Sequence, residues 1–204
     1  MKKIIILLFL FLSALSTGAQ SLDFKILDKI NTPFNEPADK NWKTFSNMNT
    51  AVCITAPVGL FVAGQIRHDK QMISNAYKLA ASIVIAEAIT ATMKSTIRRD
   101  RPFVTYPDDI YRKTTGSGYS FPSGHASTSF ALATSLSMSY PKWYVIVPSY
   151  AYACSISYSR MYLGVHYPSD VAAGMIIGAG SSYLSYKLNA WLAGKKHKKD
   201  QHAQ

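Results

Sequence analysis

The sequence predicts an all-α, membrane-embedded helical bundle of about five helices that follows an N-terminal leader. Two observations lead to this fold class. Apolar segments of helical length alternate with polar connections, and Gly, Ala, Ser and Thr are frequent inside them, as in closely packed membrane helices. Basic residues also gather in alternate connections, as the positive-inside rule expects. The five apolar segments are about 49–66, 76–94, 125–140, 142–158 and 168–192.

The first 19 residues have the three parts of a secretory signal peptide. The start, Met1–Lys3, is basic, residues 4–12 are apolar, and the small residues Thr17 and Ala19 favour cleavage after Ala19. The alternative is a retained leader that forms a sixth helix, although its apolar run is short for a span of about 20 residues. Either interpretation places the chain on the export pathway.

These features divide the chain into four regions. They are a signal peptide at 1–19, a polar N-terminal segment at 20–48, a helical bundle at 49–194 and a basic tail at 195–204. In the polar segment, Trp42 and Phe45 indicate a short amphipathic stretch that lies on a membrane face or on the body of the protein.

The net charge of +11 makes nucleic acid a partner to consider. The export signal argues against it, so we expect no nucleic acid partner. The basic residues also lie mainly in two places where an anion or a membrane surface accounts for them. Residues 94–113 form a basic connection where an anion would bind, and Lys195–Lys199 is typical of a cytoplasmic membrane flank.

The two cysteines, Cys53 and Cys154, each lie inside an apolar segment. We interpret them as small buried apolar residues rather than as a disulfide. The sequence contains no spacing typical of metal ligands, such as Cys-x2-Cys or His-Glu-x2-His. We therefore expect neither a metal nor a cofactor.

Loop charge predicts the direction of the helices. The turn at Arg67–Lys70 is basic, the turn after the third apolar segment holds Lys142, and the tail after the fifth is basic. An alternating five-helix path places all three on the cytoplasmic side. The basic connection at 94–113 then lies on the periplasmic side, where anion binding accounts for its charge. Because the apolar segments have modest mean hydropathy, a soluble periplasmic enzyme remains the alternative.

Three short stretches carry most of the chemistry. Together they supply three cations, two imidazoles, one carboxylate and a Ser-Gly turn. Arg and Lys neutralise the non-bridging oxygens of a phosphate, and backbone N–H groups at a helix start bind the same anion. One His can attack phosphorus while another handles the proton of the leaving group. The stretches are Lys94–Pro102, Pro122–His125 and Ser159–Asp170.

The first stretch ends the second apolar helix. Arg101 follows Lys94 by seven residues, so a continuing helix would place both on one face, and Pro102 marks a break near that point. The connection at 103–121 is long and irregular. We interpret it as a flap beside the site that helps to choose the substrate, with a merely solvated loop as the alternative.

The other two stretches each open a helix. Ser123 resembles an N-cap, so that the N–H groups after it point at an anion and His125 lies at the edge of the site. Pro168 is a natural first residue of a helix. Asp170 then falls in the first turn, from which its carboxylate can hold His166 in one tautomer.

The order and spacing of these stretches resemble the signature of the type 2 phosphatidic acid phosphatase superfamily. That signature is Lys-x6-Arg-Pro, Pro-Ser-Gly-His and Ser-Arg-x5-His-x3-Asp, and residues 77–190 match it without departure. The superfamily includes lipid phosphate phosphatases, bacterial class A acid phosphatases and vanadium haloperoxidases. The resemblance implies a metal-independent phosphatase with a phosphohistidine intermediate. The implied catalytic residues are His166 as nucleophile, His125 as proton donor and Asp170 as the partner of His166, with Lys94, Arg101, Ser123, Gly124 and Arg160 binding phosphate.

The resulting hypothesis is a phosphatase of a lipid phosphate or diphosphate in the bacterial inner membrane, with its active site facing the periplasm. Candidate substrates are a polyprenyl diphosphate, a phosphatidyl-type monoester and a phosphorylated lipid A. The alternative is a soluble periplasmic acid phosphatase of small phosphomonoesters. A haloperoxidase and a headgroup-binding protein without turnover are two further hypotheses. Glu87, seven residues before Lys94 on the same helix face, either balances the cations or has no role.

Overall fold

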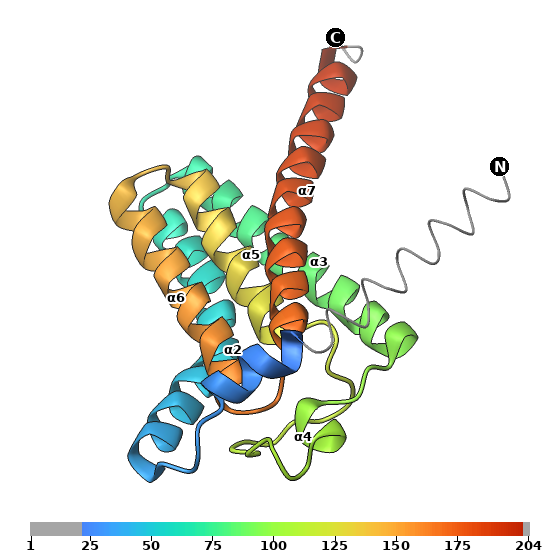
Figure 1. Ribbon diagram of the computed structural model, residues 1–204. Coiled ribbons are helices and arrows are strands. Elements are labelled where there is room, and N and C mark those ends of the chain that lie inside the picture. The colour runs from blue at the N-terminus through green and yellow to red at the C-terminus, as the bar shows by residue number, and fades with distance from the viewer. Residues whose placement is uncertain (1–21, 202–204) are drawn as a thin grey trace, which may run out of the picture.

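The computed structural model describes residues 22–201, and side chains up to residue 192. This part of the chain is all helical and contains no strand. A short helix at 22–30 precedes the bundle (Figure 1). The predicted all-α fold with five long helices is confirmed, whereas the predicted signal peptide at 1–19 lies outside the described residues. The helices are α2 (Glu36–Ile66), α3 (Lys70–Ile97), α4 (Pro102–Thr105), α5 (Gly124–Ser139), α6 (Trp143–Tyr162) and α7 (Pro168–Gln201).

Helix α2 begins well before residue 49, where its apolar run starts. The Asn35 side chain caps it by accepting a hydrogen bond from the Ala38 N–H, and the Asp39 carboxylate accepts one from the Asn35 N–H at 3.0 Å. This reciprocal cap resembles a capping box. Trp42 and Phe45 therefore lie on a long helix and pack on aromatic residues of α6, so they cover the body of the protein.

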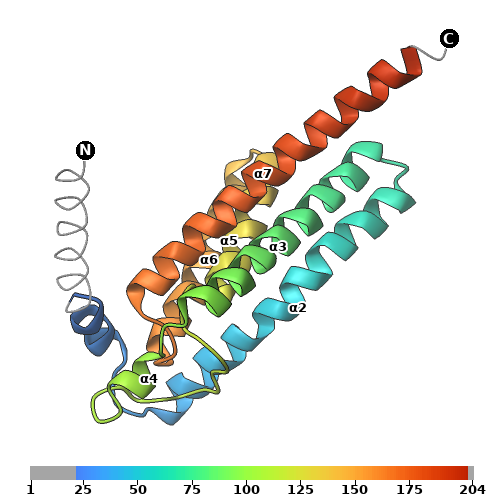
Figure 2. The same cartoon turned by 90° about the vertical axis from the view of Figure 1, so that its right-hand side faces the viewer.

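Helix α5 lies at the centre of the bundle, between α3, α6 and α7 (Figures 1 and 2). Its contact with α7 depends on two glycines of α7. A Cβ at Gly174 would lie 2.6 Å from the Ser123 carbonyl oxygen, and one at Gly178 would lie 2.7 Å from the Ala131 nitrogen. Small residues thus permit the close approach of helices that the sequence composition predicts.

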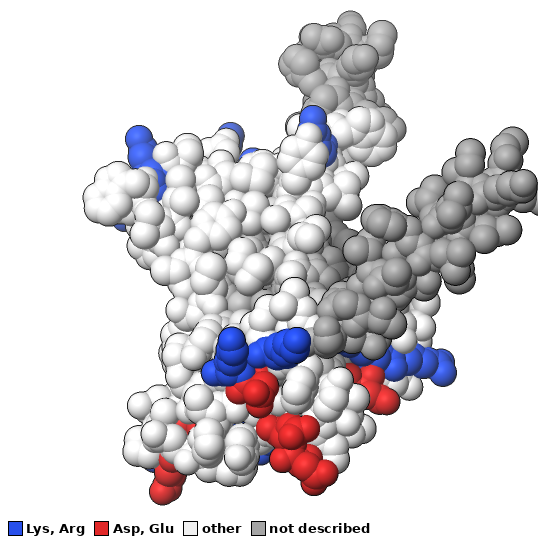
Figure 3. Space-filling view, viewed as in Figure 1, with Lys and Arg blue, Asp and Glu red and all other residues white. Residues whose placement is uncertain are grey.

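The outer surface of the bundle is apolar between its two ends. Figure 3 shows on one face that Lys, Arg, Asp and Glu gather near the two ends, with a band of other residues between them. Two helical stretches, Glu36–Ile66 and Lys70–Thr105, are long and apolar enough to cross a membrane. Large apolar side chains are exposed on several helices, among them Ile54, Val58, Val62, Val84, Val147, Ile176 and Leu184.

The two ends of the bundle differ in their connections. Short turns join α2 to α3 and α5 to α6 at the end toward which the C-terminus of α7 points (Figure 2). The long connection at 98–123, which contains α4, and the shorter one at 163–167 lie at the other end. All three motif stretches reach this second end. The motifs therefore lie at the opposite end of the bundle from the basic turns at Arg67 and Lys142, as predicted.

Both cysteines are free, as the sequence predicts. Cys53 is buried between helices, but Cys154 is exposed on α6, so the expectation of burial was wrong for Cys154. The sequence does not show on which face of α6 Cys154 lies, because the residues of a membrane helix that face lipid and those that face the protein core are both apolar.

Candidate active site

A cavity of about 610 Å³ opens among the motif residues. Four different parts of the chain contribute to its polar wall: the end of α3, the connection at 98–123, the start of α5 and the region around the end of α6. Six residues predicted from the sequence line it, namely Lys94, Arg101, Gly124, His125, Arg160 and His166. Ser123 and Asp170 lie behind this wall, both fully buried.

The first motif is not one continuous helix. α3 ends at Ile97, where Arg98 adopts a left-handed conformation with φ of 52°. Arg101 has extended backbone and occupies the N-cap position of α4. The helix that carries Lys94 therefore does not continue to Arg101, and the break expected near Pro102 is present, because proline disfavours helical backbone at the residue before it.

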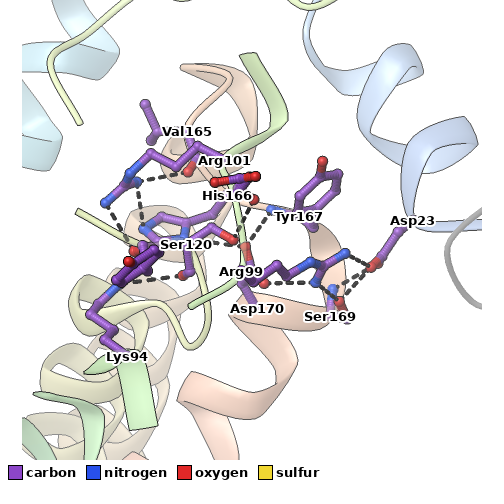
Figure 4. Close-up of polar contacts among 12 residues, drawn as sticks. Asp23, Lys94, Arg99, Arg101, Ser120, Val165, His166, Tyr167, Ser169 and Asp170 are labelled. Atoms are coloured by element: carbon purple, nitrogen blue, oxygen red, sulfur yellow. Dashed lines mark hydrogen bonds and ion pairs between the residues drawn. The ribbon is translucent and has the colours of Figure 1, made fainter. Parts of the chain in front are cut away.

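Arg101 and Lys94 hold the connection that follows them. The Arg101 guanidinium donates to the carbonyl oxygens of Ser117 at 2.8 Å and of Val165 at 2.8 Å, and the Lys94 ammonium donates to that of Tyr119 at 2.6 Å (Figure 4). A Cβ at Gly116 would lie 3.0 Å from Arg101 Nε, so glycine permits this approach. The connection at 103–121 thus lies beside the cavity, where the sequence predicts a flap. Its residues Thr115 to Ser117 line the cavity.

Two buried polar groups at this site lack hydrogen-bond partners among the described residues. They are the Ser123 hydroxyl and Arg160 Nε. Ser123 is the N-cap of α5, as predicted, but its side chain makes no capping bond. Arg160 donates through Nη1 to the Ser46 hydroxyl at 2.8 Å, which leaves Nε free. Unpaired buried groups are rare, and together with the free N–H groups at the start of α5 they suit an anionic ligand.

His166 and Asp170 lie side by side, with 3.4 Å between Nδ1 and Oδ2. The same Oδ2 accepts a hydrogen bond from the Tyr167 N–H at 2.9 Å, so Asp170 also caps α7. The other ring nitrogen, Nε2, lies 3.4 Å from Arg101 Nη1, and both residues line the cavity. Burial, together with the nearby Arg160 and Arg101, lowers the pKa of His166 to about 3 against the opposing effect of Asp170. The imidazole is therefore neutral at pH 7, as a nucleophile must be.

Glu87 lines the cavity below the cations. It lies on α3, two helical turns before Lys94, and its Oε2 is 3.8 Å from the position that a Cβ would take at Gly124. Its carboxylate has no hydrogen bond or ion pair with any residue that the structure describes. Beyond it the wall is largely apolar, with Cys53 and Ile54 of α2 facing Ile83 and Val84 of α3.

Sequence reasoning missed Arg99 and Asp23, which contact the third motif stretch, as well as Ser46, which binds Arg160. Arg99 Nη1 donates to Asp170 Oδ1 at 2.8 Å, and Arg99 Nη2 donates to Asp23 Oδ2 at 2.9 Å (Figure 4). Arg99 is part of the first motif stretch, so its position in the sequence already indicated that it lies near the site. Asp23 lies in the polar N-terminal segment, and nothing in the local sequence links it to the site.

No cluster of three or more His, Cys, Asp or Glu side chains within residues 22–192 could hold a metal ion. The polar wall instead consists mainly of nitrogen-bearing side chains, which suit an anion.

Residues 75–193 match the family model of the PAP2 superfamily. The chain belongs to the PAP2 superfamily. This match covers all three motif stretches, so the resemblance seen in the sequence is confirmed. The described helices, with their exposed apolar surface, likewise agree with the predicted membrane-embedded bundle.

Two curated PAP2-like relatives are similar over the motif region. One is an undecaprenyl-diphosphatase of Sulfolobus acidocaldarius, 36% identical over 112 residues, which cover 55% of this chain and 54% of the relative. The other is a lipid A 4'-phosphatase of Bacteroides thetaiotaomicron, 34% identical over 124 residues, which cover 54% of this chain and 55% of the relative. The chain therefore spans about half the length of each of these relatives.

The likeness to solved structures extends over more of the chain. The crystal structure of LpxE from Aquifex aeolicus matches with a TM-score of 0.71 at 25% identity, covering 81% of this chain and 95% of that one. The shared architecture thus includes helices outside the range that the family model matches.

Proposed function

We propose that this protein is a phosphatase that hydrolyses a lipid phosphate or diphosphate through a phosphohistidine intermediate at the periplasmic face of the bacterial inner membrane. The observation that carries this proposal is the two-part cavity. Its cationic part holds Lys94, Arg101 and Arg160 with both histidines, and its wall between α2 and α3 is largely apolar and reaches the exposed side chains of Ile54 and Val84. A phosphate joined to an apolar chain has the same two parts.

Substrate binding would place the phosphoryl group against the cations. Arg160 Nε and the Ser123 hydroxyl are buried donors without a partner among the described residues, so both could donate to phosphoryl oxygens. The Gly124 N–H, at the start of α5, adds a donor supported by the helix dipole. Lys94 and Arg101 contribute positive charge as the substrate develops negative charge in the transition state.

The first chemical step is attack on phosphorus. The lone pair of His166 Nε2 forms the N–P bond while the bond from phosphorus to the leaving oxygen breaks, and the imidazolium form of His125, which the negative charge of the bound substrate stabilises, gives that oxygen its proton. The ring of His166 becomes positively charged, and the Asp170 carboxylate at Nδ1 stabilises this charge. In the second step, His125 takes a proton from water, the water oxygen attacks phosphorus, and the N–P bond breaks to release phosphate.

Several features support a lipid as the substrate. The apolar wall formed by Ile54, Ile83 and Val84 suits a hydrocarbon chain. The exposed apolar side chains of the helices favour a protein in a membrane over the alternative, a soluble periplasmic acid phosphatase. The names of the two relatives also refer to a polyprenyl diphosphate and to lipid A.

Phosphate release by the purified protein in detergent tests the activity. We expect release from an undecaprenyl diphosphate, a phosphatidic acid or a lipid A substrate that exceeds release from a water-soluble alkyl phosphate, and we expect it to continue in excess EDTA. A preference for the water-soluble ester would favour the acid phosphatase instead. Loss of activity in EDTA that a divalent ion restores would contradict the metal-independent mechanism.

Cysteine labelling tests the orientation. Asp108 is exposed in the connection beside the cavity, and Gln201 lies at the end of α7. Single cysteines at these positions, in a protein without Cys53 and Cys154, would be tested with an impermeant maleimide on intact spheroplasts. We expect labelling at position 108 but not at position 201. The reverse pattern would place the site on the cytoplasmic face.

A further inference from the structure

The carboxylate of Asp23 is buried at the motif end of the protein, although it lies far from the motifs in sequence. Only 7% of the residue is exposed. Its Oδ1 accepts a hydrogen bond from the Ser169 N–H at 2.9 Å, and its Oδ2 accepts from Arg99 Nη2 at 2.9 Å and from the Ser169 hydroxyl. A buried carboxylate with three donors is held in one orientation.

Arg99 joins this carboxylate to the proposed catalytic one. Its Nη1 donates to Asp170 Oδ1 at 2.8 Å and to the Ser169 hydroxyl at 2.7 Å, while Nη2 is bound by Asp23 (Figure 4). The guanidinium also lies 3.9 Å above the ring of Tyr167. Both terminal nitrogens of the Arg99 guanidinium therefore have hydrogen-bond acceptors, and the Tyr167 ring fixes the plane of the guanidinium.

The orientation of Asp170 depends on this arrangement. Arg99 binds Oδ1 and the Tyr167 N–H binds Oδ2, so the two anchors together fix the plane of the carboxylate. That plane decides how Oδ2 faces Nδ1 of His166. The short helix that carries Asp23 is itself well anchored, because Leu27 is fully buried against Ile110 and Tyr167.

Asp23 also keeps Arg99 away from the phosphate site. Arg99 belongs to the same basic run as Lys94 and Arg101, yet it does not line the cavity. With one carboxylate on each side, its charge is balanced and its hydrogen-bond donors are occupied. Without Asp23, Nη2 would lose its partner and the guanidinium would be held less firmly against Asp170 Oδ1.

We infer that Asp23, acting through Arg99, is a positioning residue for the His166–Asp170 pair. This inference rests on the proposed function, because it takes His166 as the nucleophile. It also places part of the site's support outside residues 75–193, the range that the PAP2 family model matches. Asp23 touches no reacting atom, so it should affect the chemical step rather than phosphate binding.

Steady-state kinetics of Asp23→Asn test the inference, with Asp28→Asn as the matched control. Asp28 lies on the same short helix, but its side chain is exposed and makes no hydrogen bond or ion pair with the described residues. We expect Asp23→Asn to lower kcat by about 10-fold, comparable with the loss of outer groups that orient metal ligands. The inhibition constant of inorganic phosphate should change by less than about twofold, since the cavity cations are intact. Asp28→Asn should match the wild type.

A double-mutant cycle separates positioning from general stability. Because Asp23 acts through Arg99, the change Asp23→Asn should cost little further kcat in an Arg99→Lys background. Losses that add in the double variant would overturn the inference, and so would a wild-type kcat in Asp23→Asn. A parallel weakening of phosphate inhibition would also overturn it, because that indicates general disruption. Absence of turnover in the wild type would instead refute the proposed function, and the inference with it.

Discussion

The two ends of the helical bundle share the same helices but differ in everything that connects them. At the motif end, long connections carry carboxylates, imidazoles and cations that bind one another. Every ion pair between described residues lies there, including Arg99 with Asp170 and Lys113 with Asp39. At the opposite end, turns of a few residues carry exposed basic side chains such as Arg67 and Lys142.

This difference shows how charge is used at each end. At the motif end, most buried charges are held by opposite charge or by backbone carbonyls, because an isolated buried charge is strongly unfavourable, whereas Arg160 donates to the Ser46 hydroxyl. At the other end, the turns carry mainly exposed basic residues, with Asp69 as the N-cap of α3, and this excess of positive charge suits lipid headgroups and the positive-inside rule. Substitutions at the motif end should therefore alter turnover, while those at the opposite end should alter insertion or solubility.

The largest expected effect is that of His166→Ala. Removal of the attacking nitrogen should lower kcat by at least about 10⁴-fold, as for other covalent nucleophiles. Phosphate release and trapping of an acid-labile, alkali-stable phosphoenzyme measure this. Lys142→Ala, at the other end of the bundle, should keep kcat within about twofold. Comparable activity in His166→Ala and Lys142→Ala would contradict the functional division between the ends.

Arg160→Ala should also have a large effect. Arg160 is 5% exposed, and its Nε has no partner among the described residues, so its loss removes a buried donor and a charge from the phosphate site. We expect kcat to fall by about 10²- to 10³-fold, the usual cost of one such group. Arg160→Lys keeps the positive charge but not the planar guanidinium with its several N–H donors, so it should recover only part of the lost kcat. Full recovery would show that charge alone matters.

His125→Ala should have an effect that depends on the leaving group. A general acid contributes about 10²- to 10⁴-fold where the leaving oxygen is basic and far less where it is a good leaving group. Rates on an alkyl phosphate and on a nitrophenyl phosphate, measured with the same preparation, give the comparison. Equal losses on the two esters would remove His125 from the role of proton donor.

Glu87→Gln should have the smallest effect, and its sign is informative. The carboxylate lies about 10 Å along α3 from Lys94, in the wall of a cavity that receives an anion. At an effective dielectric constant of about 40, removal of this charge should favour an anionic substrate by on the order of 1 kcal/mol, or about fivefold in KM. The decrease in KM should be greater for a diphosphate than for a monophosphate. An increase in KM would indicate that Glu87 holds the cations in place.

Much of the site could be predicted because its parts follow local rules. Ser123 before a helix and Pro168 with Asp170 in a first turn are local capping signals, and the structure places all of them as the spacing indicates. The break near Pro102 follows a local rule too, since proline restricts the residue before it. The start of α2 was missed because the Asn35 cap precedes a polar turn, while apolar periodicity begins only near residue 49.

The remaining features depend on contacts between distant residues. Asp23 meets Ser169 across 146 positions, and Ser46 meets Arg160 across 114. No periodicity or motif connects such pairs, because they result from how the helices pack. The exposure of Cys154 could not be predicted for a similar reason, since both faces of a membrane helix are apolar.

The buried contact of Asp23 has a consequence for protein engineering. A chimera that joins this chain's motifs to the N-terminal part of a relative would keep every signature residue and still change the neighbourhood of Arg99 and Arg160. Such a chimera would take the residues at positions 23 and 46 from the relative, because Asp23 and Ser46 both precede the family-matched range. The rate of the enzyme could then be adjusted from a segment that carries none of its chemistry, which makes residues 22–66 a natural target for directed evolution.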